Sequence, residues 1–134
     1  MTQKLSILVV DDDADDREVF GDVMQEIDPA INCIFAANGE DALNVLGECR
    51  NKLPAYIFLD LNMPRMNGRQ CLEAMKNIDA FRDIPVIILS TSSMEKEIRE
   101  TLALGAVGFI TKPNNLSDLK KKIEGVLKTA DNSR

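Results

Sequence analysis

The sequence predicts an α/β protein built as a (βα)5 doubly wound parallel sheet, and three observations support this class. Four apolar runs, LSILVV, YIFL, PVIIL and VGFIT, are continuous rather than alternating, as expected for parallel strands buried on both faces. Segments with the apolar spacing of amphipathic helices alternate with these runs. Turn-forming residues separate the two kinds of segment, so βα units fill the chain of 134 residues.

The elements are expected in strict alternation. LSILVV is the first strand, and the helix after it carries an apolar stripe within residues 19–27. INCIFAA is the second strand, and Asn38 opens the second helix. YIFL, PVIIL and VGFIT are the remaining strands, with a helix after Gly68, one that ends at Gly105, and a last one near the C-terminus. The inner faces of the last two helices are expected at Ile98, Leu102, Leu116, Leu119 and Ile123.

Length and composition predict one domain over residues 1–134, with a core of about residues 4–128 and no output domain. We find no segment typical of a signal peptide or a membrane span, so we expect a cytoplasmic protein. A net charge of -6 opposes direct binding to nucleic acid and favours a protein partner. The chain contains no histidine, so any histidine in its chemistry must come from another molecule.

Polar residues that could bind a ligand or react follow the predicted strands. Asp11 and Asp12 come after the first strand, and Asp60 ends the third. Ligand sites of open α/β sheets lie outside the carboxyl ends of the strands, where these carboxylates would meet. Carboxylates placed that close repel one another unless a cation lies among them. Mg²⁺ suits the site better than Ca²⁺, because it binds through one or two carboxylates and accepts phosphate oxygens as further ligands.

A calcium-binding EF-hand loop is the rival interpretation of the acidic run, because Asp11, Asp13 and Asp15 have its spacing. It fails because Asp16 stands where the loop needs glycine and Asp22 where it needs glutamate.

Two further strand ends complete a site for a phosphoryl group. Ser90 supplies a hydroxyl after the fourth strand, and Lys112 supplies an ammonium after the fifth. Phosphoryl transfer needs mainly positioning and charge neutralisation, and an aspartate carboxylate is an established nucleophile for it. We therefore expect an aspartyl-phosphate chemistry at this edge of the sheet.

The segments VVDDD, FLDLNMPRMNG, PVIILST and GFITKP resemble the signature segments of two-component response-regulator receiver domains, in order and spacing. The resemblance implies a flavodoxin-like strand order of 2-1-3-4-5. It also implies that Asp60 accepts a phosphoryl group from a sensor histidine kinase or a histidine phosphotransfer protein. Asp11, Asp12 and Asp60 would then bind Mg²⁺ together with the backbone carbonyl of Asn62.

The same resemblance assigns further roles. Lys112 would contact the phosphoryl group, Ser90 and Phe109 would form the switch, and the Lys112–Pro113 peptide would be cis. Asn62 and Ser92 would tune dephosphorylation. The face formed by the fourth helix, the fifth strand and the fifth helix would bind a downstream protein. We assign Asp13 to the cap of the first helix.

Several alternatives stay open. A phosphorelay intermediate would pass the phosphoryl group onward, and a metal-dependent aspartyl-phosphate hydrolase would share the nucleophile but needs a separate acid/base carboxylate. A scaffold would bind partners without phosphorylation. A flavin or nucleotide binder would need a glycine-rich phosphate loop after the first strand, where this chain has three acids. The expected receiver turns over no metabolite and in that sense is not an enzyme.

Overall fold

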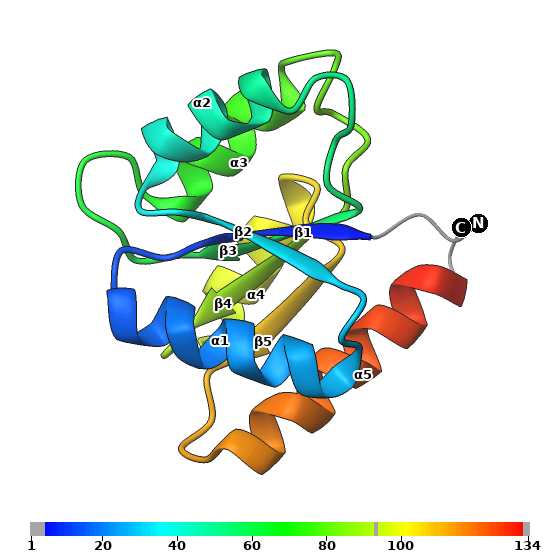
Figure 1. Cartoon of the computed structure of the whole chain (residues 1–134). Helices are drawn as coiled ribbons and strands as arrows, with labels where there is room; N and C mark the ends of the chain where they lie inside the picture. The colour runs from blue at the N-terminus through cyan, green and yellow to red at the C-terminus, as the bar shows by residue number, and fades with distance from the viewer. Residues whose placement is uncertain (1–4, 93, 133–134) are drawn as a thin grey trace.

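The computed structural model describes residues 5–92 and 94–132, and strands and helices alternate throughout this part of the chain. Figure 1 shows a twisted sheet with helices on both sides. The elements are β1 (Ser6–Val10), α1 (Ala14–Ile27), β2 (Asn32–Ala36), α2 (Gly39–Glu48), β3 (Tyr56–Asp60), α3 (Gly68–Lys76), β4 (Val86–Ser90), α4 (Glu95–Ala103), β5 (Gly108–Thr111) and α5 (Leu116–Asn132).

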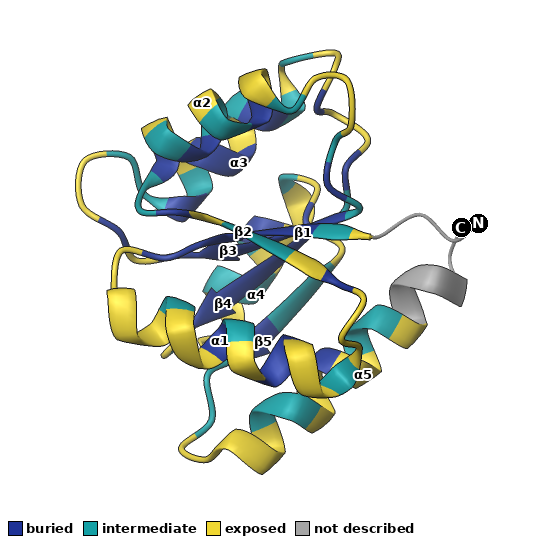
Figure 2. Cartoon of the chain, in the orientation of Figure 1, coloured by how far each residue is buried: buried dark blue, intermediate teal, exposed yellow. Residues whose placement is uncertain are grey.

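The strands are parallel and follow the order β2-β1-β3-β4-β5, which confirms the predicted topology. The continuous apolar runs give wholly buried central strands, because β3 and β4 are covered on both faces (Figure 2). In the register of β1 and β3, Val10 lies beside Leu59. The residues that follow these two positions, Asp11 and Asp60, therefore emerge at the same edge of the sheet.

Side-chain alternation along the strands divides the core into two clusters. One cluster joins the sheet to α1 and α5 and includes Phe20, Phe58 and Ile123. The other joins the opposite face to α2 and α3 and includes Leu46 and Leu72. Figure 1 shows α2 and α3 above the sheet and α1 and α5 below it. The sheet is thus covered on both faces, and its carboxyl edge is left for the loops.

Short polar side chains cap α1, α2 and α3 next to that edge. The Asp13 carboxylate caps α1 by accepting the backbone N–H groups of Asp15 and Asp16, as predicted. Asn38 caps α2, and Asn67 and Gln70 form a reciprocal capping box at the start of α3. Gly105 follows α4 with φ of +110°, the left-handed conformation expected at a helix end.

Three expectations were wrong. Leu116, expected on the inner face of α5, is the first residue of that helix and is 58% exposed. Among the described residues every peptide bond is trans, including Lys112–Pro113; the trans form is favoured before proline by about 0.5–1 kcal/mol. Leu102, expected on the inner face of α4, is 45% exposed, and the buried residue of that helix is its neighbour Thr101. The Thr101 hydroxyl can be buried because it donates to the carbonyls of Glu97 and Ile98.

In the described part of the chain, no helix has the length and apolar content needed to span a membrane.

Candidate functional site

Three carboxylates converge where β1 and β3 end. Asp11, Asp12 and Asp60 each place an oxygen within 4.8 Å of the others. Asp11 and Asp60 are buried, whereas Asp12 is exposed. Oxygen donors at this spacing, with one side open to solvent, match what Mg²⁺ requires, because this ion keeps several waters. The three acids therefore fit a divalent cation, as the sequence predicted.

The Asp11 side chain is fixed from two directions. Its Oδ1 accepts the backbone N–H of Asp13 at 3.0 Å, and its Oδ2 accepts the Lys112 ammonium at 3.0 Å. The Arg17 guanidinium donates to the backbone carbonyl of Asp11 at 2.6 Å. The bonds from Asp13 and Arg17 tie the end of β1 to the start of α1. Those from Asp13 and Lys112 hold the Asp11 carboxylate in place although its charge is buried.

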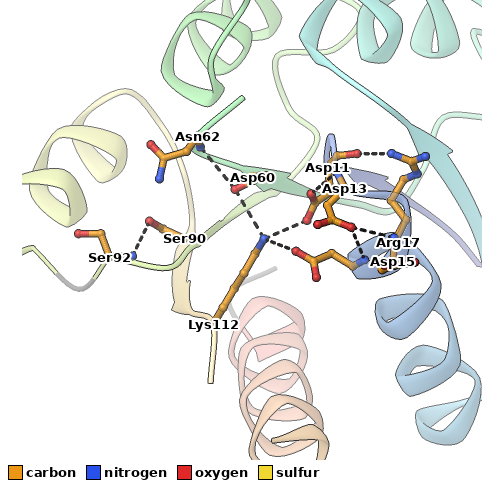
Figure 3. Close-up of polar contacts among 10 residues, drawn as sticks. Asp11, Asp13, Asp15, Arg17, Asp60, Asn62, Ser90, Ser92 and Lys112 are labelled. Carbon is orange, nitrogen blue, oxygen red and sulfur yellow. Dashed lines mark hydrogen bonds and ion pairs between the residues drawn. The ribbon is translucent and has the colours of Figure 1, made fainter. Parts of the chain in front are cut away.

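Lys112 extends from the loop after β5 into the acidic cluster (Figure 3). Its Nζ lies 3.0 Å from Asp11 Oδ2, 3.3 Å from Asp16 Oδ2 and 3.8 Å from Asp60 Oδ1. The first two contacts are hydrogen bonds, and the third is an ion pair beyond hydrogen-bond distance. One ammonium thus partly neutralises three carboxylates.

Burial and neighbouring charges shift the pKa values of Asp60 and Lys112. Burial raises the pKa of Asp60 from 3.8 to about 6; Lys112 opposes that rise, while Asp11 and Asp12 add to it. Burial lowers the pKa of Lys112, but the hydrogen bond that Lys112 donates to Asp11 and the charges of Asp60, Asp11 and Asp16 outweigh it and raise the pKa overall. At neutral pH the site therefore holds an ionised Asp60 beside a cationic Lys112.

Sheet alternation explains which side chains meet. Val9, Phe58 and Ile110 face α1 and α5, and Asp11, Asp60 and Lys112 each lie two positions after one of them. These three polar residues consequently gather on the same side of the sheet edge, as their mutual distances show.

Ser90 belongs to the other side of the sheet, because it lies two positions after Ile88 of the opposite core cluster. Its side chain is fully buried, and its hydroxyl accepts the backbone N–H of Ser92 at 3.0 Å (Figure 3). Among the described residues this hydroxyl forms no hydrogen bond with Asp60, so it must turn to reach a group placed on that carboxylate. Phe109 is half-buried and packs against the same cluster as Ile88, its neighbour across β4 and β5.

The β3–α3 loop holds the backbone around Asp60. The Asn62 N–H donates to Asp60 Oδ1 at 3.4 Å, and the Gly68 N–H donates to the carbonyl of Leu61 at 2.9 Å. Arg65 adopts a φ of 65°, a left-handed conformation that turns the loop back toward the sheet. Asn62 therefore lies next to Asp60, and its predicted carbonyl contact to a metal stays a prediction.

Sequence reasoning missed three residues of this site: Asp16, Arg17 and Gly68. Asp16 had a detectable signal, because it precedes the buried Phe20 by four residues and so lies on the inner side of α1. Arg17 had none, since its partner is a backbone carbonyl. The need for Gly68 depends on how closely α3 approaches β3.

A pocket of about 620 Å³ opens beside the cluster, between α1 and the β5–α5 loop. Apolar side chains of α1 and α5 form one part of its wall, and Asp11, Asp16 and Lys112 form another. Lys112 and Asp11 thus border the pocket, whereas Asp12 and Asp60 do not line it.

Comparisons with known proteins agree with this arrangement. Residues 7–124 match the sequence model of the response regulator receiver domain. Response regulator Rcp1 of Synechocystis sp. is 32% identical over 124 residues, which cover 90% of this chain and 84% of Rcp1. The protein-glutamate methylesterase/protein-glutamine glutaminase of Clostridium acetobutylicum is 36% identical over 128 residues, which cover 94% of this chain. The chain spans about a third of that enzyme, 36% of its length, and the match is to its receiver part.

Solved structures show the same fold. The phosphorylated cyanobacterial phytochrome response regulator RcpA superposes with a TM-score of 0.83 at 28% identity, over 92% of this chain and 91% of RcpA. The Mn²⁺-bound form of Rcp1 superposes with a TM-score of 0.79 at 31% identity, over 91% of each chain. Binding of a divalent metal at the acidic pocket and phosphorylation are typical of this flavodoxin-like fold family. The family match over residues 7–124, together with the Rcp1 match over most of both chains, shows that this chain belongs to the response regulator receiver domain family.

Proposed function

We propose that Asp60 accepts a phosphoryl group from a phosphohistidine of a sensor histidine kinase or histidine phosphotransfer protein. The observation that carries this proposal is the position of the Asp60 carboxylate, buried between Asp11, Asp12 and Lys112 at the open edge of the sheet. A receiver domain has a signalling role, and the proposed modification would switch this chain between two states that a partner distinguishes.

Asp60 has the properties that a nucleophile at this place needs. With a pKa of about 6 it is largely ionised at neutral pH, and burial leaves it less stabilised by water than an exposed carboxylate. In the transfer, an Asp60 oxygen forms a bond to phosphorus while the phosphorus–nitrogen bond of the donor breaks. The electron pair of that bond returns to the imidazole, which takes up a proton from solvent.

The acidic cluster would hold Mg²⁺ through Asp11, Asp12 and Asp60, with the carbonyl of Asn62 as a further ligand. When bound, the ion would neutralise the negative charge that collects on Asp60 and the phosphoryl oxygens. Lys112 would supply a second positive charge beside the acceptor, since its Nζ lies 3.8 Å from Asp60 Oδ1. Asn62 lies close enough to affect water near the acyl phosphate, which supports its proposed role with Ser92 in setting the rate of hydrolysis.

Ser90 would move in response to the phosphoryl group and transmit the change to β5. A phosphoryl group adds about 1.5 to 2 negative charges and strong acceptors, which would draw the Ser90 hydroxyl away from the Ser92 N–H. Ser90 pairs with Thr111 across β4 and β5, and Phe109 lies two positions before Thr111 on the same side. Movement of Ser90 would therefore change the space available to Phe109.

The output face would consist of α4, β5 and α5. Exposed apolar side chains at Met94, Leu102 and Val107 support binding of a protein there, because each exposes about half of its surface (59%, 45% and 53%). The donor would approach elsewhere, at the edge of the sheet where Asp12 of the acidic cluster is exposed. Passing the phosphoryl group onward to a second histidine uses the same site and stays an alternative outcome.

The test is incubation with Mg²⁺ and acetyl phosphate, followed by intact-protein mass spectrometry. Wild type should gain one phosphoryl group and Asp60→Asn none, while Asp22→Asn, which removes an exposed acid of α1, should behave as wild type. Transfer from a phosphorylated kinase should follow the same pattern. An unmodified wild type would favour a scaffold, and repeated turnover of small phosphomonoesters would favour a hydrolase.

A further inference from the structure

The Lys112 ammonium is held toward α1 rather than toward the acceptor. Its two hydrogen bonds go to Asp11 at 3.0 Å and Asp16 at 3.3 Å, whereas Asp60 lies at 3.8 Å. A lysine ammonium has three N–H donors, and here the two that form hydrogen bonds go to acids other than the residue that is proposed to be modified. A closer contact with a phosphoryl group on Asp60 would draw the ammonium toward the acceptor and away from these two partners.

Helix geometry places Asp16 at this position. Asp16 precedes Phe20 by four residues, and the Phe20 ring is buried under α1, so the two side chains share the inner side of the helix. Asp15, one position earlier, is exposed and forms neither a hydrogen bond nor an ion pair with Lys112. Adjacent helix residues do not face the same way, which explains the difference.

The two partners of Lys112 differ in how easily they can be released. The Asp11 side chain is 3% exposed, so losing the ammonium would leave a buried charge without its partner. The Asp16 side chain is 49% exposed, so water can replace the lysine there. When a more strongly charged partner appears beside Lys112, Asp16 is the contact that breaks first.

We propose that Asp16 is a positioning residue that holds the Lys112 ammonium toward α1 in the unphosphorylated protein and releases it to a phosphoryl group on Asp60. This inference rests on the proposed function. Asp16 opposes the phosphorylated state in two ways: it competes for Lys112, and its charge repels the added phosphoryl oxygens. The residue thus biases the switch toward the resting state and limits how long or how fully the protein is phosphorylated.

Beryllofluoride with Mg²⁺ tests the inference without catalysis, because it adds to a carboxylate with the shape of a phosphoryl group. Titration followed by amide chemical shifts gives an apparent dissociation constant for each variant. We expect Asp16→Asn to bind beryllofluoride about 1.5- to 5-fold more tightly than wild type, the range of an exposed ion pair of about 0.2–1 kcal/mol.

Asp15→Asn is the matched control, since it removes the same charge from the same first turn of α1 without touching Lys112. Asp15→Asn should change the dissociation constant of beryllofluoride less than Asp16→Asn does. The difference between the two variants measures the direct contact with Lys112, apart from the loss of one negative charge near the site. Asp16→Glu, which can still reach the ammonium, should restore the wild-type value. The lifetime of the acyl phosphate should rank the variants in the same order.

Two outcomes would overturn the inference. If wild type binds beryllofluoride and Asp16→Asn does not differ from Asp15→Asn, Asp16 has no positioning role and the proposed function stands. If Asp16→Asn binds more weakly than wild type, Asp16 prepares Lys112 for the phosphoryl group rather than restraining it. Failure of wild type to bind beryllofluoride or to be phosphorylated would instead reject the proposed function, and this inference with it.

Discussion

A Cβ atom built on Gly68 would lie 2.6 Å from the backbone carbonyl oxygen of Asp60. It would also lie 2.7 Å from the Cα of Leu61, and neither backbone atom can move aside as a flexible side chain could. The first residue of α3 is therefore pressed against the peptide that carries the proposed phosphoryl acceptor. Only glycine allows this approach.

Gly68→Ala should consequently disturb both stability and the site. We expect the free energy of unfolding to fall by about 1–3 kcal/mol, the usual cost of overpacking, and phosphorylation by acetyl phosphate to slow. Gly47→Ala is the control, because nothing lies within 4 Å of its Cβ position in α2, and it should stabilise by about 0.5–1 kcal/mol. Urea denaturation measures both. Equal stability of Gly68→Ala and wild type would mean that α3 shifts at little cost.

Asp60 should make stability depend on pH when no metal is present. Its pKa is raised from 3.8 to about 6 in the native state, so between these values the native protein binds more protons than the unfolded chain. Stability therefore falls as pH rises through this window. In EDTA and above pH 6, the free energy of unfolding of Asp60→Asn should exceed that of wild type by about 1–3 kcal/mol. This range follows because a change of one pKa unit corresponds to about 1.4 kcal/mol.

That advantage of Asp60→Asn should shrink as the pH is lowered toward 4, because wild type then regains its proton. Urea denaturation at pH 7.5 and at pH 4.5 measures the gap, with Asp22→Asn as the control for loss of an acid. A gap that is the same at both pH values would show that Asp60 is not the titrating group.

Removal of Mg²⁺ should lower the melting temperature. A ligand that binds only the native state stabilises it by mass action, by about 1.4 kcal/mol at a concentration tenfold above its dissociation constant. Relief of the repulsion between Asp11, Asp12 and Asp60 is the physical source of that binding. Asp12→Asn should lose most of the shift between Mg²⁺ and EDTA, and Asp22→Asn should keep it. Identical melting curves for wild type in Mg²⁺ and EDTA would argue against a metal at this cluster.

Lys112→Met should lower stability in EDTA and increase the stabilisation that added Mg²⁺ gives. In EDTA we expect a loss of about 1–3 kcal/mol, because the buried Asp11 carboxylate loses its hydrogen-bonded cation. Mg²⁺ should then stabilise the variant more than it stabilises wild type, since the acids that bind it are no longer partly neutralised. Melting curves over a Mg²⁺ titration measure this gain. Lys121→Met, at an exposed position of α5, should show neither effect, and a gain no larger than in wild type would contradict the account.

Some features of the fold were readable in the sequence because they depend on burial alone. Central parallel strands are covered on both faces, so YIFL and PVIIL had to be continuous apolar runs, and the residues that end them had to reach the open edge. Local hydrogen bonding likewise made the Asp13 cap and the Gly105 helix end predictable. The strand order came from the resemblance to receiver domains rather than from the residues themselves.

Other features depend on partners that are distant in the sequence. The bond between Asp16 and Lys112 joins residues 96 positions apart; the spacing to Phe20 places Asp16 on the inner side of α1 but does not identify Lys112 as its partner. The expectation for Leu102 was wrong because a helical period does not fix which neighbouring residue faces the core, and Thr101 could bond within its own helix. The requirement for Gly68 likewise appears only when α3 and β3 are placed together.

The sequence by itself determined which side chains stand at the carboxyl edge, because hydrophobic burial of the strands leaves their polar ends nowhere else to lie. The tertiary structure decided which of those side chains contact one another. Sheet alternation brings Asp11, Asp60 and Lys112 together on the side of α1 and turns Ser90 to the other side. The rotation of α1 about its axis places Asp16 beside Lys112, so Asp16 becomes the third acid, with Asp11 and Asp60, that contacts this ammonium. The placement of strands and helices relative to one another sets these contacts, so they follow from packing rather than from any local run of residues.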